Sequence, residues 1–205
     1  MNHVVTTSLL GEVFITLFVI MDPPGTIPVF LALTSGNDAA QRKRAAWQAV
    51  VVSFGVIVAF ALFGRQILTY LNISLPALQC AGGLLLLLVA LELLTGREKD
   101  PASDEDVNIA MVPLGTPLLA GPGAIVAIMV FVGRVHSGPD LVAVAAGVVG
   151  VHVIMWITMR FSVGILKLLR ESGVTLVTRI SGLLLSAIAV QLVADAVRAF
   201  IEGSG

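Results

Sequence analysis

The sequence is poor in charge, in cysteine and in aromatic side chains. Only 12% of its 205 residues are charged, while 57% are hydrophobic. Soluble domains carry about 25% charged and 45–50% apolar residues. This balance excludes an ordinary soluble enzyme and a disordered segment. The formal net charge of −1 also excludes the basic surface with which proteins attract the phosphates of nucleic acids.

Reactive side-chain patterns are missing as well. Cys80 has no second cysteine in the chain to pair with, and the three histidines are scattered, so no disulfide and no transition-metal site is indicated. No nucleophile elbow, H-E-x-x-H pair, Walker loop or Rossmann fingerprint occurs. We therefore predict a protein that is not an enzyme and holds no cofactor. A membrane enzyme or assembly factor remains an alternative class without a supporting motif.

Long uncharged stretches are what the sequence does have. Residues 45–64, 66–91, 107–133 and 141–159 contain no Lys, Arg, Asp or Glu, and about 20 apolar residues cross a bilayer as a helix. Two further apolar stretches contain a few acidic residues. None shows the alternation of a barrel strand. We predict one all-α integral membrane domain over 1–205, with helices at about 8–35, 45–69, 75–95, 108–134, 140–165 and 178–201.

The basic residues predict how these helices are oriented. If the N-terminus lies outside, nine of the twelve Lys and Arg residues fall on the cytoplasmic side, as expected from the positive-inside rule. The polar linker at 96–107 is then cytoplasmic and both termini are outside. No Lys or Arg precedes Glu12, so we expect the first apolar segment to be retained rather than cleaved as a signal peptide. The predicted location is the cell (inner) membrane.

The two halves of the chain resemble each other. Residues 22–27 (DPPGTI) align with 120–125 (AGPGAI) at an offset of 98, and 83–86 (GLLL) aligns with 182–185 (GLLL) at an offset of 99. Three crossings separate the copies, so the second copy is inverted in the membrane. Inverted repeats are an architecture of secondary transporters. We expect repeat one at about 8–95 and repeat two at about 108–201.

Proline and glycine interrupt the first and fourth predicted helices at matching positions. Pro113, Gly115 and the residues around them cannot form a regular helix, because proline lacks a backbone donor and glycine loosens the helix. Irregular backbone at membrane depth is tolerated only where it is buried in protein or lines a cavity. We predict that both helices are discontinuous and bind a solute there. The alternative is two simple kinks. The candidate binding residues are Asp22, Pro23, Pro24, Gly25, Thr26, Pro28, Thr116, Pro117, Gly121, Pro122 and Gly123.

Several polar side chains in the spans have two interpretations each. Asp22 can cap the second half of its helix or contact solute, and the two roles are compatible. Thr26 and Thr116 can contact solute or bond back to their own helices. His152 fits helix packing better than a proton relay. Glu92 and Asp195 fit the membrane interface, and Gln191 is placed to bond across helices.

The stretches LFVIMDPPGTIPVF (17–30) and VPLGTPLLAGPGAI (112–125) closely resemble those of the MarC family. The resemblance covers essentially the whole chain. It implies six spans in an inverted-repeat fold with broken first and fourth helices. It also implies membership of a group that includes Na⁺-coupled carriers of glycine and alanine.

We therefore expect a secondary transporter of small neutral amino acids that works by alternating access. Unwound carbonyls and half-helix ends suit a zwitterion and a coupling cation, so Na⁺ or H⁺ is the expected coupling ion. The expected partners are the lipid bilayer and the amino acid, with no nucleic acid. The alternatives are a passive channel or facilitator, or an exporter of another small polar solute.

Overall fold

The structure, a computed structural model, describes residues 2–96 and 119–202, and every regular element in these ranges is a helix. The helices are bounded as follows: α1 Asn2–Met21, α2 Pro23–Leu33, α3 Ala39–Tyr70, α4 Leu75–Thr95, α5 Pro122–Gly133, α6 Gly138–Arg160 and α7 Ser162–Ile201. An all-helical chain agrees with the prediction. The candidate residues Thr116 and Pro117, like Pro113, Gly115 and most of the expected linker, lie outside the described residues.

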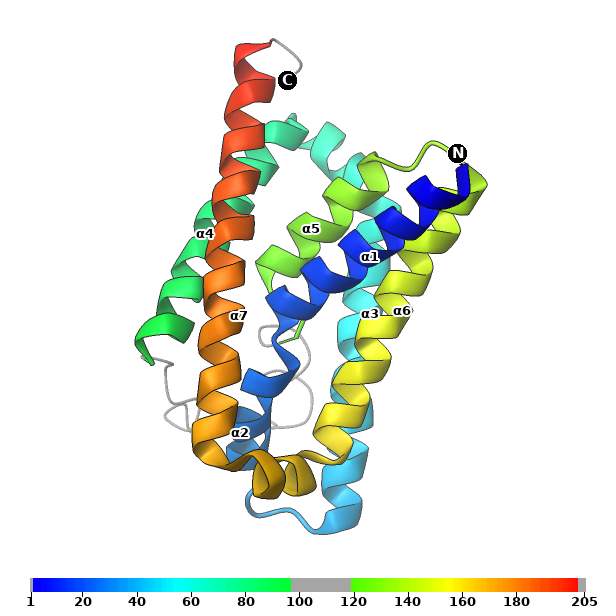
Figure 1. Cartoon of the computed structure of the whole chain (residues 1–205). Coiled ribbons are helices and arrows are strands. Elements are labelled where there is room, and N and C mark those ends of the chain that lie inside the picture. Colours follow the sequence, from blue (N-terminus) through cyan, green and yellow to red (C-terminus); the bar gives the residue numbers. More distant parts are fainter. Residues whose placement is uncertain (1, 97–118, 203–205) are drawn as a thin grey trace.

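The helices form one bundle (Figure 1). Helices α4 and α7 run antiparallel along one edge, and α3 and α6 form the other side. Helices α1 and α5 cross obliquely between them, and α2 continues below α1. Asn2 and the last turn of α7 lie at the same end of the bundle, as an even number of crossings requires.

Five stretches among the described residues are long and apolar enough to cross a bilayer. They are Thr7–Leu33, Ala39–Tyr70, Leu75–Thr95, Gly138–Arg160 and Ser172–Ile201. They correspond to five of the six predicted spans, although α3 begins six residues earlier than expected. Helix α5 is apolar but has only 12 residues, or about 18 Å at 1.5 Å per residue. It forms the second half of the predicted span 108–134.

The connection after α6 differs from the expectation. The predicted spans 140–165 and 178–201 leave residues 166–177 outside any helix, and these bounds are wrong. Helix α6 ends at Arg160 and α7 begins at Ser162, while Arg170 interrupts α7 with φ 58° and ψ 169°. The first part of α7 lies across the lower end of the bundle before the long part rises (Figure 1). The stretch SVGILKLL is mostly apolar, so boundaries placed at charged residues miss a short helix there.

Large apolar side chains point outward over most of the bundle. Leu62, Leu88, Val142 and Leu183 are each at least 59% exposed. Soluble monomers rarely expose an apolar surface of this extent. Hydrocarbon around the bundle removes the cost of this exposure, so the surface indicates a lipid environment.

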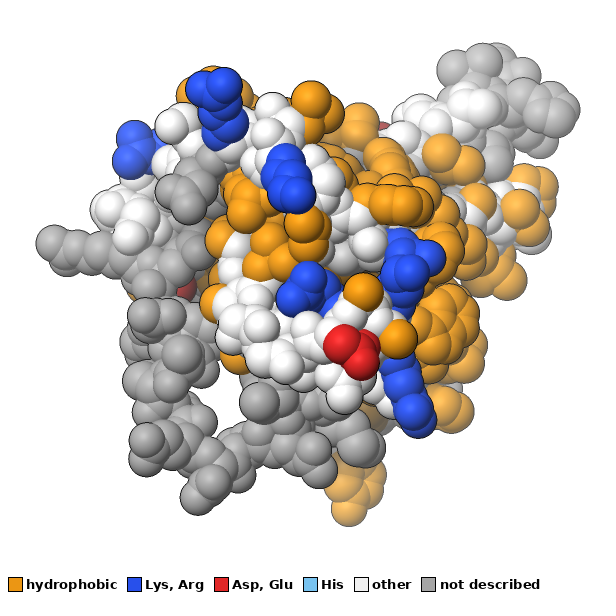
Figure 2. Space-filling view, turned by 90° about the horizontal axis from the view of Figure 1, so that it is seen from below, with side chains coloured by type: hydrophobic (Ala, Val, Ile, Leu, Met, Phe, Trp, Pro, Cys, Tyr) orange, Lys and Arg blue, Asp and Glu red, His pale blue; other side chains and the backbone are white. Residues whose placement is uncertain are grey.

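Basic side chains gather at the lower end of the bundle. Figure 2, which looks at this end, shows Lys and Arg side chains spread over it. The start of α3, the end of α6 and the first half of α7 carry Arg42, Lys43, Arg44, Arg160, Lys167, Arg170 and Arg179. The guanidinium of Arg42 also donates to the carbonyls of Thr34 and Asn37, at 3.2 and 3.4 Å. It thereby ties the start of α3 to the end of α2.

Helices α4 and α7 approach each other so closely that two glycines are required. A Cβ atom on Gly83 would lie 2.8 Å from the carbonyl oxygen of Ala189 and 2.7 Å from Val193. A Cβ atom on Gly182 would lie 3.3 Å from the carbonyl oxygen of Ala90 and would also crowd Leu94. Small residues allow this kind of backbone approach between membrane helices. The two glycine contacts therefore fix the spacing of the α4–α7 pair.

A buried polar pair joins α3 to α6. The Ser53 hydroxyl lies 3.3 Å from Nε2 of His152, and Nδ1 of His152 lies 2.8 Å from the carbonyl oxygen of Val148. Both side chains are buried. Each ring nitrogen thus has a partner, which buried polar groups require. This agrees with the interpretation of His152 as a helix-packing residue.

We expect Gly83→Ala to destabilise the protein, because the added methyl group meets the backbone of α7 and overpacking costs about 1–3 kcal/mol. Gly55→Ala is the matched control, since a Cβ atom at Gly55 on α3 meets nothing within 4 Å. The control should be neutral or more stable by about 0.5–1 kcal/mol, because alanine favours a helix over glycine. Unfolding of the purified protein in detergent measures both changes. Equal stabilities of the two variants would contradict this packing.

Candidate functional site

The first predicted interruption lies at Asp22, between α1 and α2. Asp22 has φ 40° and ψ 70°, a left-handed conformation that few residues other than glycine, asparagine and aspartate adopt. The next two residues, Pro23 and Pro24, have no backbone N–H. The carbonyls of Val19 and Ile20 therefore lack the donor that a continuous helix supplies four residues later. The chain presents these oxygens at the end of α1.

The side chain of Asp22 is buried, with 6% of the residue exposed. Asp22 occupies the N-cap position of α2, as predicted, but its side chain makes no capping hydrogen bond. The carboxylate lies against Gly25, where a Cβ atom would collide with Oδ2. Gly25 is thus needed for the carboxylate to occupy this place. A negative charge beside the N-terminus of α2 is favoured by the helix dipole.

Thr26 bonds back to its own chain. Its hydroxyl donates to the carbonyl of Pro23 at 2.7 Å and lies 3.2 Å from that of Asp22. The structure thus contains the backbone bond expected as one interpretation of Thr26, and its contact with solute stays a prediction. Pro24 is half-buried and Pro28 is exposed, so Pro28 lies on the outer face of α2.

Thr178 on α7 belongs to this site, although no motif in the sequence singles it out. The residue is 6% exposed, and its hydroxyl has no hydrogen-bond partner among the described residues. A Cβ atom on Gly25 would lie 3.2 Å from this hydroxyl oxygen. The hydroxyl is therefore directed toward the interruption. A buried hydroxyl without a partner costs free energy, which makes it a candidate solute contact.

The second interruption is the beginning of α5. Gly121 is extended, with φ −60° and ψ 165°, and its carbonyl accepts from the N–H groups of Ala124 and Ile125 at 3.0 and 3.2 Å. Pro122 has no N–H, so the N–H of Gly123 is the first donor of this half-helix. Helix N-termini attract anions through such donors and the dipole. The start of α5 is thus suited to a carboxylate.

The two interruptions lie next to each other. A Cβ atom on Gly123 would lie 3.5 Å from Ile20, two residues before Asp22, and would collide with Leu86 of α4. Figure 1 shows the start of α5 beside the end of α1. The structure therefore brings Asp22, Gly25, Gly121 and Gly123 into one region of the bundle. The backbone donors at α5 and the carbonyl acceptors at α1 face the same neighbourhood.

A small apolar cluster lies, along α1 and α7, between this region and the residues nearer the upper end of the bundle. Its members are buried residues of α1, α4 and α7: Val19, Leu86, Ala90, Leu185 and Ala189. On α1 the cluster lies between Asp22 and Thr16, and on α7 it lies between Thr178 and Gln191. Buried apolar side chains disfavour water and ions. We call this cluster the apolar seal.

A crevice of about 240 Å³ lies above the apolar seal. Helices α1, α4, α5 and α7 form it, and its lining residues include Glu12, Thr16, Gln79, Arg134, Gln191 and Asp195. Gln191 does not bond across helices as expected, because its Nε2 donates to Oδ1 of Asp195 on the same helix at 2.8 Å. The order from the upper end inward is therefore crevice, apolar seal and paired interruptions.

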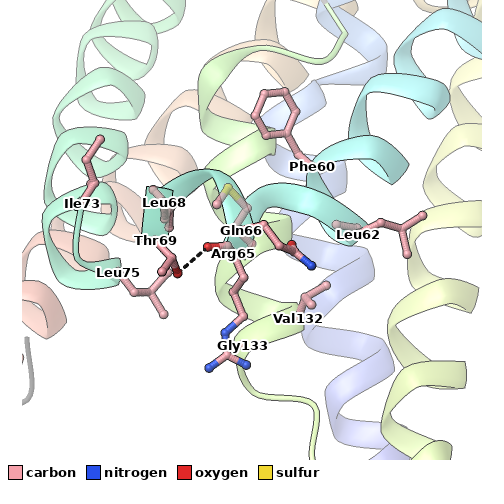
Figure 3. A pocket seen from close by; sticks show the side chains of 12 residues that line it. Phe60, Leu62, Arg65, Gln66, Leu68, Thr69, Ile73, Leu75, Val132 and Gly133 are labelled. Carbon is pink, nitrogen blue, oxygen red and sulfur yellow. Dashed lines mark hydrogen bonds between the residues drawn. The ribbon is translucent and has the colours of Figure 1, made fainter. Parts of the chain in front are cut away.

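Another hollow, of about 290 Å³, lies at the corner between α3 and α4 and contains none of the predicted site residues. Figure 3 shows Arg65 and Gln66 extending from α3 toward Val132 and Gly133 at the end of α5. The hydroxyl of Thr69 donates to the carbonyl of Arg65 at 2.9 Å. This hollow is separate from the paired interruptions, so we do not assign the site to it.

No three His, Cys, Asp or Glu side chains come together as a metal site within 2–96 and 119–202. The oxygen atoms at the interruption include those of the Asp22 carboxylate, the Val19 and Ile20 carbonyls and the Thr178 hydroxyl. Hard cations prefer such oxygen ligands.

Comparison with known proteins identifies the family. Residues 7–201 match the MarC family integral membrane proteins. A UPF0056 membrane protein of Methanocaldococcus jannaschii is 36% identical over 90% of this chain and 94% of its own. UPF0056 membrane protein YvbG of Bacillus subtilis is 34% identical (91% and 92%), and YhcE of Escherichia coli is 33% identical (93% and 92%). No solved structure matches. The chain belongs to the MarC family of integral membrane proteins.

Proposed function

We propose that this protein is a secondary active transporter of small neutral amino acids such as glycine and alanine. The observation that carries the proposal is the meeting of two helix interruptions, at Asp22 and at Gly121–Gly123. Donors at the start of α5 suit the carboxylate of an amino acid. The Asp22 carboxylate and the Val19 and Ile20 carbonyls suit its ammonium group or a coupling Na⁺ or H⁺.

The packing of the helices supports the proposed inverted repeat. With the offset of 98–99 residues, α5 corresponds to α2, α3 to α6 and α4 to α7. Helix α2 packs on α6 and α7, while α5 packs on α3 and α4. The glycine contacts are reciprocal too, since Gly83 meets Ala189 and Gly182 meets Ala90. Positions 83 and 182 are 99 residues apart, and so are positions 90 and 189. Such reciprocity is characteristic of a two-fold relation.

Alternating access follows from the proposed symmetry together with the apolar seal. The seal closes the site toward the upper end, as a carrier requires in one of its two states. A channel keeps a continuous route open, so a packed cluster between crevice and site favours a carrier. The passive facilitator and the exporter of another small polar solute remain the competing functions.

Reconstituted uptake tests the function. We expect vesicles that contain the protein to accumulate labelled alanine or glycine several-fold when an inward Na⁺ or H⁺ gradient is applied, and to lose the accumulation when the gradient is collapsed. Uptake that only equilibrates, whatever the gradient, would support a facilitator. Absence of uptake for every neutral amino acid in both directions would contradict the proposed substrate.

Asp22→Asn should fold normally and reduce uptake about tenfold or more. Asparagine adopts the left-handed conformation of residue 22, but it removes the charge that contributes a charge-assisted hydrogen bond worth about 1.5–3 kcal/mol. Asp38→Asn is the matched control, because Asp38 caps α3 at the exposed lower end and asparagine caps equally well. Uptake assays and unfolding in detergent on both variants separate charge from stability. Unchanged uptake by Asp22→Asn would exclude its role.

The proposed orientation places both termini outside the cytoplasm and the basic lower end inside. In a Cys80→Ser background, His136→Cys should react with a membrane-impermeant maleimide in intact cells, because His136 lies in the exposed turn between α5 and α6. Ser35→Cys, in the turn between α2 and α3, should react only after the cells are permeabilised. The reverse labelling pattern would invert the orientation.

A further inference from the structure

The crevice above the apolar seal holds charged groups of both signs. Glu12 interrupts the apolar face of α1, and Arg134 follows the last turn of α5. Oε2 of Glu12 lies 3.3 Å from a terminal guanidinium nitrogen of Arg134, with the side chains 52% and 60% exposed. The carboxylate of Asp195 faces the same crevice, held by Gln191. The crevice thus presents one guanidinium and two carboxylates.

Stability does not account for this arrangement. Exposed ion pairs contribute little to folding, and an ionisable residue within a membrane span is a candidate for function. Ser8 also donates its hydroxyl to Oε1 of Glu12, at 3.3 Å. The carboxylate of Glu12 is thereby held at the mouth of the crevice, within reach of a solute.

The dimensions fit a small solute. The volume of about 240 Å³ corresponds to about eight water molecules at about 30 Å³ each. The floor of the crevice is apolar, because Ala127, Val130 and Phe131 of α5 and Leu192 of α7 line it as well. A small amino acid would find charged groups at the rim and apolar contacts for its side chain below, which is the usual composition of a ligand site.

The crevice also leads toward the paired interruptions. Glu12, Thr16 and Val19 are spaced four and three residues apart and therefore share one face of α1. An adjoining hollow of about 540 Å³ is lined by Glu12, Thr16, Val19 and Ile188 among others. Val19 belongs to the apolar seal, and Asp22 follows it by three residues. Along α1, the apolar seal therefore lies between the crevice and Asp22.

We infer that this crevice is a second, outer docking site for a zwitterionic α-amino acid. Arg134 binds the carboxylate, since guanidinium groups pair well with carboxylates. Glu12, with Asp195 beside it, binds the ammonium group. When the solute binds, the ion pair between Glu12 and Arg134 is replaced by one contact of each of these residues with the solute. The inference rests on the proposed function for the choice of solute, and its test is separate.

Binding of alanine to the purified full-length protein in detergent, measured by calorimetry, tests the docking site. The measurement is made in the Asp22→Asn variant, so that the inner site does not contribute. We expect alanine to bind, while propionate and ethylamine, which each lack one of its charges, bind about tenfold more weakly or worse. Equal affinities for the three probes would overturn the assignment to a zwitterion. Absence of alanine binding would overturn the docking site.

Variants of the charged pair identify the residues. Glu12→Gln and Arg134→Gln, added to Asp22→Asn, should each weaken alanine binding about tenfold or more, while Glu12→Asp and Arg134→Lys should restore most of it. Arg198→Gln is the matched control, because Arg198 is an exposed arginine near the same end of α7 that does not line the crevice. Unchanged affinity in both Gln variants would overturn the inference. Thr16→Leu fills the crevice without touching a charge and should also abolish binding; if the Gln variants fail to fold, this variant decides.

Uptake distinguishes this inference from the proposed function. With Asp22 intact, Glu12→Gln and Arg134→Gln should raise the KM for alanine and leave the maximal rate nearly unchanged. Crevice binding without any uptake by the unmodified protein would overturn the proposed transport and retain the docking site. Normal uptake with an unchanged KM in both variants would overturn the docking site and retain transport.

Discussion

Everything in this structure depends on where backbone groups find hydrogen-bond partners in the absence of water. A helix in hydrocarbon satisfies its own N–H and C=O groups, and each group left over costs several kcal/mol. Pro23 and Pro24 remove two donors at once, so the end of α1 cannot lie against lipid. The surrounding helices, α5, α6 and α7 among them, bury this interruption. In a membrane, irregular backbone must therefore lie in the protein interior.

Part of the fold could be predicted from the sequence, because the signals are local. A long stretch without charged residues directly predicts a membrane-spanning helix. The pair Asp22–Pro23 predicts an interruption, because proline has no backbone N–H to donate. The short helix after Phe161 was not predicted, since it carries Lys167 and has no charge-free length to mark it. A helix that lies across the end of the bundle does not need a long charge-free stretch, so a search for membrane spans does not detect it.

Only the part of the site that depends on backbone conformation could be predicted from the sequence. Asp22, Gly25, Gly121 and Gly123 stand out through proline and glycine, and the structure brings them together. Thr178 could not be selected, because one threonine among apolar residues looks the same whether it faces lipid or the interruption. Glu12 and Arg134 are 122 residues apart, and nothing local pairs them. Thr116 and Pro117 stay predictions, as they lie outside the described residues.

The close contact of α4 with α7 has a mechanical consequence. Glycine at 83 and 182 lets the two backbones approach closely, so these two helices are held in direct contact. Helix α1, in contrast, has an incomplete hydrogen-bond ladder at its junction with α2. The charged residue Asp22 therefore also stands where no continuous ladder joins the two parts of the first span.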